Sequence, residues 1–136
     1  MGPSICSGDG TSEGWMKKLL SGGHEKIPRS NIGFVDVRDC AIAHLKAVEL
    51  AEAANKRFIL CCSDNWFREV TAILAPIYNP KGCKVPTEDA DGEDPDPGNP
   101  CNNTRSREVL GIQYTPLATT MCDMADSLIA SGKVTL

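Results

Sequence analysis

The stretch from Gly33 to Asp39, with the helix that it begins, constrains the fold more than any other part of this 136-residue chain. A short aromatic and β-branched run predicts a strand there, and the pair Asp36 and Asp39 predicts a cap for the helix that follows. Apolar residues then recur at helical spacing up to Asn55, and a second apolar run covers residues 58–62. Strand, helix and strand within about thirty residues predict a β-α-β crossover, with residues 58–62 as a buried parallel strand. The fold class that follows is α/β.

Composition limits the classes of protein to which the chain can belong. Hydrophobic residues make up 41% and charged residues 24%, as in an ordinary globular protein, and the length fits one domain at most. The net charge of −4 argues against a nucleic-acid partner, because binding to phosphates needs a basic face. No apolar run reaches the length of a membrane span, and residues 1–20 lack the basic-then-apolar order of a secretory signal. We therefore expect a cytoplasmic protein with no membrane contact.

Seven cysteines raise the question of disulfides or a metal site. Their odd number, without a secretory signal, argues against a disulfide framework. No Cys-x-x-Cys pair occurs, neither histidine lies at a metal-binding spacing from a cysteine, and the adjacent Cys61 and Cys62 would point to opposite faces of a strand. We expect free, buried thiols and no metal site.

The first residues of the chain predict a loop followed by a helix. Residues 1–12 are rich in glycine, proline and serine, and Ser12 is expected to cap a helix that ends at Gly22 and Gly23. The loop, which includes Thr11, could present backbone donors to a phosphate. A plain connecting turn explains the composition more simply. The residues alone leave both explanations open.

Residues 87–101 predict a solvated and mobile loop. Six acidic residues lie between Glu88 and Asp96, interleaved with prolines, a composition that cannot bury a core and repels itself. Acids at alternate positions also suit a calcium ion, but the spacing is not that of an EF-hand loop. Apolar stripes predict helices before and after this loop, at about 66–75 and about 117–131.

Several stretches together resemble one enzyme family. They read Gly-Phe-Val-Asp-Val-Arg-Asp at 33–39, Arg-Phe-Ile-Leu at 57–60, Lys-Val-Pro-Thr at 84–87, Asn-Thr-Arg-Ser-Arg-Glu-Val-Leu-Gly-Ile at 103–112 and Tyr-Thr-Pro-Leu at 114–117. They resemble the extended short-chain dehydrogenase/reductases of the NAD-dependent epimerase/dehydratase superfamily. Within that family the chain is most similar to the dihydroflavonol reductases, cinnamoyl-CoA reductases and 3β-hydroxysteroid dehydrogenases. The acidic loop interrupts the similarity, where relatives carry a longer apolar segment that lines the substrate pocket.

The resemblance implies the carboxyl-terminal portion of a Rossmann-like NAD(P)-binding fold with its small substrate lobe, without the amino-terminal dinucleotide-binding half. Residues 1–136 would form a single, partial domain, and the cofactor would be NADP or NAD. Gly2 and Pro3 match a Gly-Pro pair that follows the catalytic residues in relatives. Ser12 lies where relatives place a serine on the cofactor pyrophosphate. Pro3, Thr11 and Ser12 are thus the cofactor-binding residues that the resemblance implies.

Two motifs that such a reductase needs do not occur in the chain. There is no Gly-x-x-Gly-x-x-Gly turn for the dinucleotide, and neither Tyr78 nor Tyr114 has a lysine four residues later. We therefore expect no catalytic residue in this chain, no tight cofactor binding by it alone and no activity in isolation. The expected function is the substrate-side part of an NAD(P)-dependent oxidoreductase that acts on a small-molecule carbonyl or secondary alcohol.

A non-catalytic binding or interaction protein that kept the substrate-lobe fold is the alternative. A truncated gene product, a partial gene model and a naturally shortened relative would all have such a sequence. In each case the strand expected at 58–62 would lack its neighbours and leave an exposed sheet edge. We therefore also expect self-association.

Overall fold

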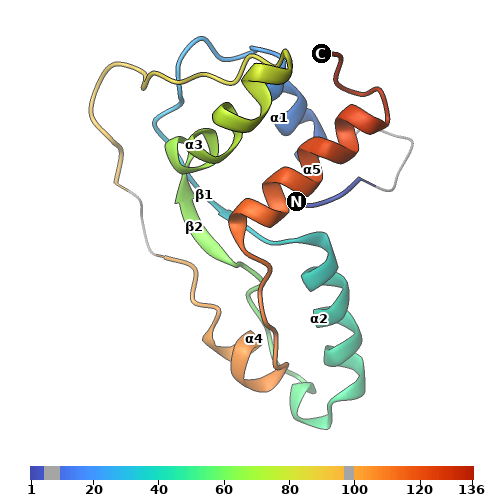
Figure 1. Cartoon of the computed structure of the whole chain (residues 1–136). Coiled ribbons are helices and arrows are strands. Elements are labelled where there is room, and N and C mark those ends of the chain that lie inside the picture. The colour runs from blue at the N-terminus through green and yellow to red at the C-terminus, as the bar shows by residue number, and fades with distance from the viewer. Residues whose placement is uncertain (5–9, 97–99) are drawn as a thin grey trace.

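Helices predominate in the structure, a computed structural model that describes residues 1–4, 10–96 and 100–136 (Figure 1). The helices form two groups of unequal size, and a short two-stranded ribbon joins them. Within the described ranges, no helix combines the length and the apolar character that a membrane span requires.

Three helices form the larger group around the main hydrophobic core. Helices α1 (Thr11–Leu20) and α3 (Phe67–Tyr78) both pack against α5 (Leu117–Ala130). Each turns an apolar stripe inward, so the predicted helices before and after the acidic loop are confirmed. The side chains at the centre of this core, all almost fully buried, include Met16, Leu19, Val70, Leu74, Met121 and Leu128.

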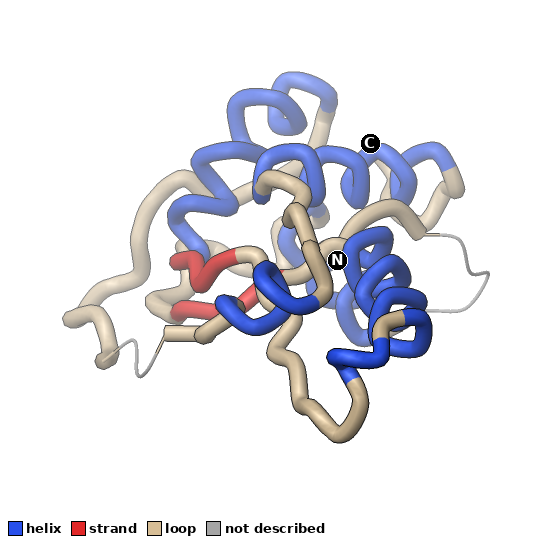
Figure 2. The backbone as a smooth tube through the Cα atoms, turned by 90° about the horizontal axis from the view of Figure 1, so that it is seen from below, coloured by secondary structure: helices blue, strands red, loops and turns tan. Residues whose placement is uncertain are grey.

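The ribbon between the two groups, red in Figure 2, consists of two antiparallel strands. Strand β1 (Asn31–Phe34) pairs with β2 (Ser63–Trp66), with Gly33 opposite Asp64, and β2 leads directly into α3. The expected parallel crossover is therefore wrong. Residues 58–62 form no strand, and the residues that do pair come directly after them.

At the end of the apolar run expected as a strand, a side chain rather than a neighbouring strand binds the backbone carbonyls. The side-chain amide of Asn103 donates to the carbonyl oxygens of Cys61 and Cys62, at 2.7 and 3.3 Å. Phe58 and Leu60 pack against the smaller core. An apolar run of this length does not by itself distinguish a parallel strand from such a segment.

The smaller group of helices lies at the other end of the ribbon (Figure 1). It contains α2 (Val37–Glu49), the 3-10 turn η1 (Ala51–Ala53) and α4 (Thr104–Val109). A second 3-10 turn, η2 (Asn79–Lys81), follows α3 in the larger group. The smaller core is formed by the buried residues Ala43, Ala53, Leu110 and Ile112.

Two aspartates at the start of α2 join the groups. Asp36 is buried and accepts hydrogen bonds from the backbone N–H of Arg38 and from the hydroxyl of Thr120, both at 2.9 Å, so its predicted capping role is confirmed. Asp39 instead accepts from the backbone N–H and the hydroxyl of Thr115, at 2.7 and 2.9 Å. Both carboxylates therefore hold the start of α5 against the start of α2.

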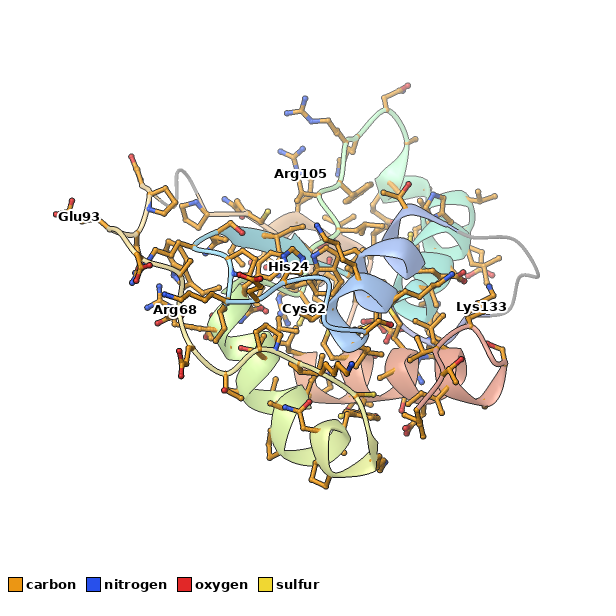
Figure 3. The ribbon with its side chains drawn as sticks, turned by 90° about the horizontal axis from the view of Figure 1, so that it is seen from above. His24, Cys62, Arg68, Glu93, Arg105 and Lys133 are labelled. Carbon is orange, nitrogen blue, oxygen red and sulfur yellow. The ribbon has the colours of Figure 1, made fainter. Side chains whose placement is uncertain are left out.

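Part of the acidic loop is attached to the body of the protein. The carboxylate of Asp94 pairs with Arg29 at 2.9 Å and also with Arg68. The side chain of Glu93, in contrast, points outward from the protein (Figure 3). Residues 97–99 of the loop lie outside the described residues. The mobility of the loop stays a prediction, and the ion pairs of Asp94 oppose it locally.

The outer side of α2 exposes large apolar side chains. Ile42, Leu45 and Val48 lie three residues apart, hence on one side of the helix, and Leu45 and Val48 are 64% and 89% exposed. This α2 face, rather than the edge of a parallel sheet, is the surface through which we now expect the chain to self-associate.

Replacing two residues of the α2 face by lysine is expected to restore a monomer. In the double variant Leu45→Lys/Val48→Lys, two charges would have to be desolvated on association, so the dissociation constant should rise by at least about a hundredfold. Sedimentation velocity over a concentration series measures this. The control Gln113→Lys/Thr119→Lys adds the same charge at exposed polar positions and should associate like the parent. An unchanged association of the first variant would exclude the α2 face.

Candidate functional site

All three residues that the family resemblance implies for the cofactor line one pocket at the beginning of α1. The pocket has a volume of about 270 Å³, and Pro3, Thr11 and Ser12 share it with Val37 of α2 and Met124 of α5. Pockets that enclose a drug-sized ligand have volumes of roughly 300–1,000 Å³. The pocket therefore fits a part of a dinucleotide, such as its diphosphate, rather than the whole molecule.

A glycine lets the first residues of the chain approach α2 closely. Gly2 has a φ of +105°, in the left-handed region that favours glycine, and a Cβ at this position would lie 3.0 Å from Oδ1 of Asp36. The backbone N–H of Val37 donates to the carbonyl oxygen of Met1 at 2.7 Å. The glycine thus places Pro3 at the edge of the pocket.

The first turn of α1 supplies backbone donors at the pocket. The helix begins at Thr11, and its N-cap residue is Gly10, which has no side chain to cap the helix. Ser12, which the sequence predicts as the cap, is instead the second helical residue, and both Thr11 and Ser12 are exposed. The first N–H groups of a helix have no intrahelical acceptor and lie at the positive end of its dipole, which suits phosphate oxygens.

An ion pair neutralises the acidic residue of this turn. Glu13 would repel a phosphate, but its carboxylate accepts hydrogen bonds from Nζ of Lys133, at 2.7 Å, and from the hydroxyl of Ser4. These bonds lower the pKa of Glu13, the bond from Lys133 most strongly. Lys133 follows the end of α5 (Figure 3), and its side chain is only 14% exposed. The positive end of α1 therefore remains attractive to an anion.

Sequence reasoning missed Glu13 and Met124, which line this pocket, and Lys133, which pairs with Glu13. Glu13 and Lys133 are 120 residues apart, and no spacing rule connects residues at that distance. Met124 belongs to the predicted apolar stripe of α5, but a stripe does not indicate which of its members borders a pocket.

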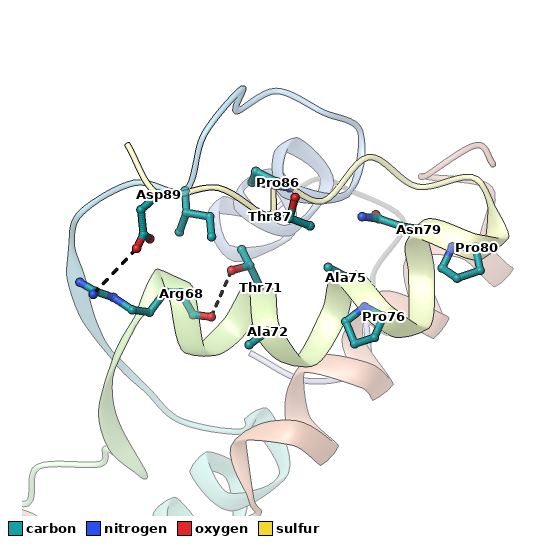
Figure 4. Close-up of a pocket in the computed structure, with 11 residues that line it drawn as sticks. Arg68, Thr71, Ala72, Ala75, Pro76, Asn79, Pro80, Pro86, Thr87 and Asp89 are labelled. Atoms are coloured by element: carbon teal, nitrogen blue, oxygen red, sulfur yellow. Dashed lines mark hydrogen bonds and ion pairs between the residues drawn. The ribbon is translucent and has the colours of Figure 1, made fainter. Parts of the chain in front are cut away.

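A larger cavity than the α1 pocket lies along α3 (Figure 4). It has a volume of about 640 Å³ between α3 and residues 86–89, and among the described residues it shares no lining residue with the α1 pocket. Its polar groups bind one another: Arg68 pairs with Asp89 at 4.0 Å, and the side chain of Asn79 exchanges two hydrogen bonds with the backbone of Val85, at 2.8 and 2.9 Å. Because these groups are already paired, the α1 pocket is the better candidate for cofactor binding.

Known proteins similar to this chain are reductases, although no protein-family model matches it. Cinnamoyl-CoA reductase 1 of Arabidopsis thaliana is 30% identical over 116 residues, which are 85% of this chain and 33% of that protein. The cinnamoyl-CoA reductase CAD2 of Medicago truncatula is 29% identical over 128 residues, 94% of this chain and 38% of that protein. The crystal structure of Gre2 from Candida albicans with NADPH superposes with a TM-score of 0.69 at 25% identity, over 96% of this chain and 41% of Gre2.

The chain thus spans between a third and two fifths of the curated relatives named here. Its helices and small sheet match the carboxyl-terminal part of a Rossmann-like reductase fold. Together with the sequence stretches, these matches make the chain similar, over most of its own length, to cinnamoyl-CoA reductases and to the carboxyl-terminal part of the extended short-chain dehydrogenase/reductase fold.

Proposed function

We propose that the chain is the substrate-side part of an NAD(P)-dependent oxidoreductase that reduces a small-molecule carbonyl or oxidises a secondary alcohol. The observation that carries this proposal is the convergence of Pro3, Thr11 and Ser12 on one pocket at the beginning of α1. The similarity to cinnamoyl-CoA reductases supports the oxidoreductase class, and the NADPH in the Gre2 structure favours NADP or NAD as cofactor.

The residues of the α1 pocket would bind the cofactor pyrophosphate. The hydroxyls of Thr11 and Ser12 and the first N–H groups of α1 would donate to its oxygens, while Pro3 and Val37 would border it. When bound, the nicotinamide cofactor supplies or accepts the hydride. The proton donor and the glycine-rich turn would come from residues outside this chain, since the sequence contains neither motif. The chain alone is therefore proposed to be inactive.

Substitution of Ser12 tests the cofactor assignment. In a protein completed by the amino-terminal half of a related reductase, Ser12→Ala should weaken NADPH or NADH binding by about 1.5–3 kcal/mol, the usual loss of a hydrogen bond to a charged group. The dissociation constant should thus rise roughly ten- to hundredfold. Cofactor fluorescence titration measures it.

Ser21→Ala, at the other end of the same helix, is the matched control and should leave the affinity unchanged. If Ser12→Ala also leaves it unchanged, the α1 pocket is not the cofactor site. A completed protein that folds but binds no nicotinamide cofactor would favour the alternative, a binding or interaction protein that kept this fold.

A further inference from the structure

Three potential metal ligands meet beside the ribbon, far from the α1 pocket in the sequence. Sγ of Cys61, a carboxylate oxygen of Asp64 and Sγ of Cys101 all lie within 4.8 Å of one another. Cys61 is buried and Cys101 is exposed, so the cluster extends from the interior to the surface. None of the three residues lines the proposed cofactor pocket.

A glycine leaves the space into which these groups point. Gly33 pairs with Asp64 in the ribbon, and a Cβ on Gly33 would lie 2.9 Å from Sγ of Cys61, 3.0 Å from Oδ1 of Asp64 and 3.2 Å from Sγ of Cys101. The three ligand atoms therefore converge on one point that any other residue would fill. The backbone N–H of Cys101 donates to Oδ2 of Asp64 at 2.6 Å, which fixes the approach of the two segments.

We propose that Cys61, Asp64 and Cys101 bind a Zn²⁺ ion, with a water molecule as the fourth ligand. Thiolate and carboxylate are ligands that zinc accepts, at about 2.3 Å for sulfur and about 2.0–2.2 Å for oxygen. Tetrahedral coordination at those lengths separates the ligand atoms by roughly 3.5–3.8 Å. Sγ of Cys61 and Oδ1 of Asp64 are already 3.9 Å apart. This separation is close to the one that a tetrahedral zinc site requires.

Zinc binding would break both S–H bonds and release the two protons to solvent. The hydrated ion would keep one water and exchange its other waters for two Zn–S bonds and one Zn–O bond to Asp64. The site replaces the sequence-based expectation of no metal site. That expectation rested on the spacing of neighbouring cysteines, whereas Cys101, at the end of the acidic loop, is about forty residues from Cys61 and Asp64. The proposal does not depend on the proposed oxidoreductase function.

Zinc titration of the reduced, full chain tests the site. Competition against a chromogenic chelator should give one zinc ion per chain, and Co²⁺ in its place should produce a thiolate-to-cobalt absorption band in the near ultraviolet. Cys101→Ser, at an exposed position, should lower the zinc affinity at least a hundredfold and remove the band. Cys61→Ser should do the same, and circular dichroism checks that each variant is folded.

Cys62→Ser is the matched control, because Cys62 is adjacent in sequence but its thiol donates to the carbonyl oxygen of Thr115 instead. It should bind zinc like the parent. Gly33→Ala puts a methyl group into the site and should weaken binding without removing a ligand. The proposal is overturned if the parent binds no zinc, if Cys101→Ser binds it as tightly as the parent, or if the protein isolated from cells carries a Cys61–Cys101 disulfide and no zinc.

Discussion

Replacement of Asp36 by alanine is expected to lower the free energy of unfolding by about 3 kcal/mol, because three interactions are lost together. The α2 helix loses its cap, the buried hydroxyl of Thr120 loses its acceptor, and the guanidinium of Arg38 loses a bidentate partner at 2.9 and 2.7 Å. Urea denaturation measures the change. It is best done in the Leu45→Lys/Val48→Lys background, which should remain monomeric.

The second ion pair of the same arginine provides the control. Arg38 also binds Asp123 at 2.7 Å, but both side chains there are about two fifths exposed. Asp123→Ala should therefore cost less than about 1 kcal/mol. Equal losses for Asp36→Ala and Asp123→Ala would contradict the role given to Asp36.

The effect of Asp36 should also depend on pH. Burial alone would raise the pKa of Asp36, but hydrogen bonds from Arg38 and Thr120 outweigh it and lower the pKa from 3.8 to about 2. The folded state thus favours the ionised form, a contribution of about 2 kcal/mol that is complete above the unfolded pKa. It is lost as the pH falls through about 4 towards 2. The difference in stability between the parent and Asp36→Ala should shrink over that range.

Local signals predicted the helices well and the strand pairing poorly. The α5 helix follows from an apolar stripe, and α4 from a short run that ends at Gly111, whose φ is +65°. The pairing of β1 with β2 depends on residues about thirty positions apart. Phe58 and its apolar neighbours looked more like a strand than the polar residues of Ser63–Trp66, which actually pair. Which residues form the paired strands depends on backbone hydrogen-bond partners elsewhere in the chain, and hydrophobic periodicity does not reveal them.

For the candidate sites too, some residues could be predicted from the sequence and others could not. The family resemblance identified Pro3, Thr11 and Ser12, and all three do line one pocket. It did not indicate the pair of Glu13 with Lys133, nor the approach of Cys61 to Cys101. These groups meet only because α1 packs on α5 and because the end of the acidic loop returns to the ribbon.

The largest change in the rate of NADPH or NADH oxidation is expected when the chain is fused to an amino-terminal half that carries the two missing motifs. Alone, it contains neither the glycine-rich turn nor the Tyr-x-x-x-Lys pair, so it should oxidise no NADPH or NADH with aldehyde or ketone substrates. Loss of a positioned proton donor alone costs roughly 10²–10⁴ in rate, and the cofactor would also lack most of its site. A fusion that supplies both motifs ahead of Met1 should restore turnover.

The direct test of this account is the rate of NADPH and NADH oxidation by that fusion and by the chain alone. The fusion would carry the amino-terminal half of a cinnamoyl-CoA reductase, and both proteins would be assayed with a panel of aldehydes and ketones. A fusion in which the tyrosine of the Tyr-x-x-x-Lys pair is replaced by phenylalanine controls for turnover by contaminants. The account predicts turnover only in the fusion with the intact pair. Turnover by the purified chain alone, or a folded, cofactor-binding fusion without turnover on any substrate, would contradict it.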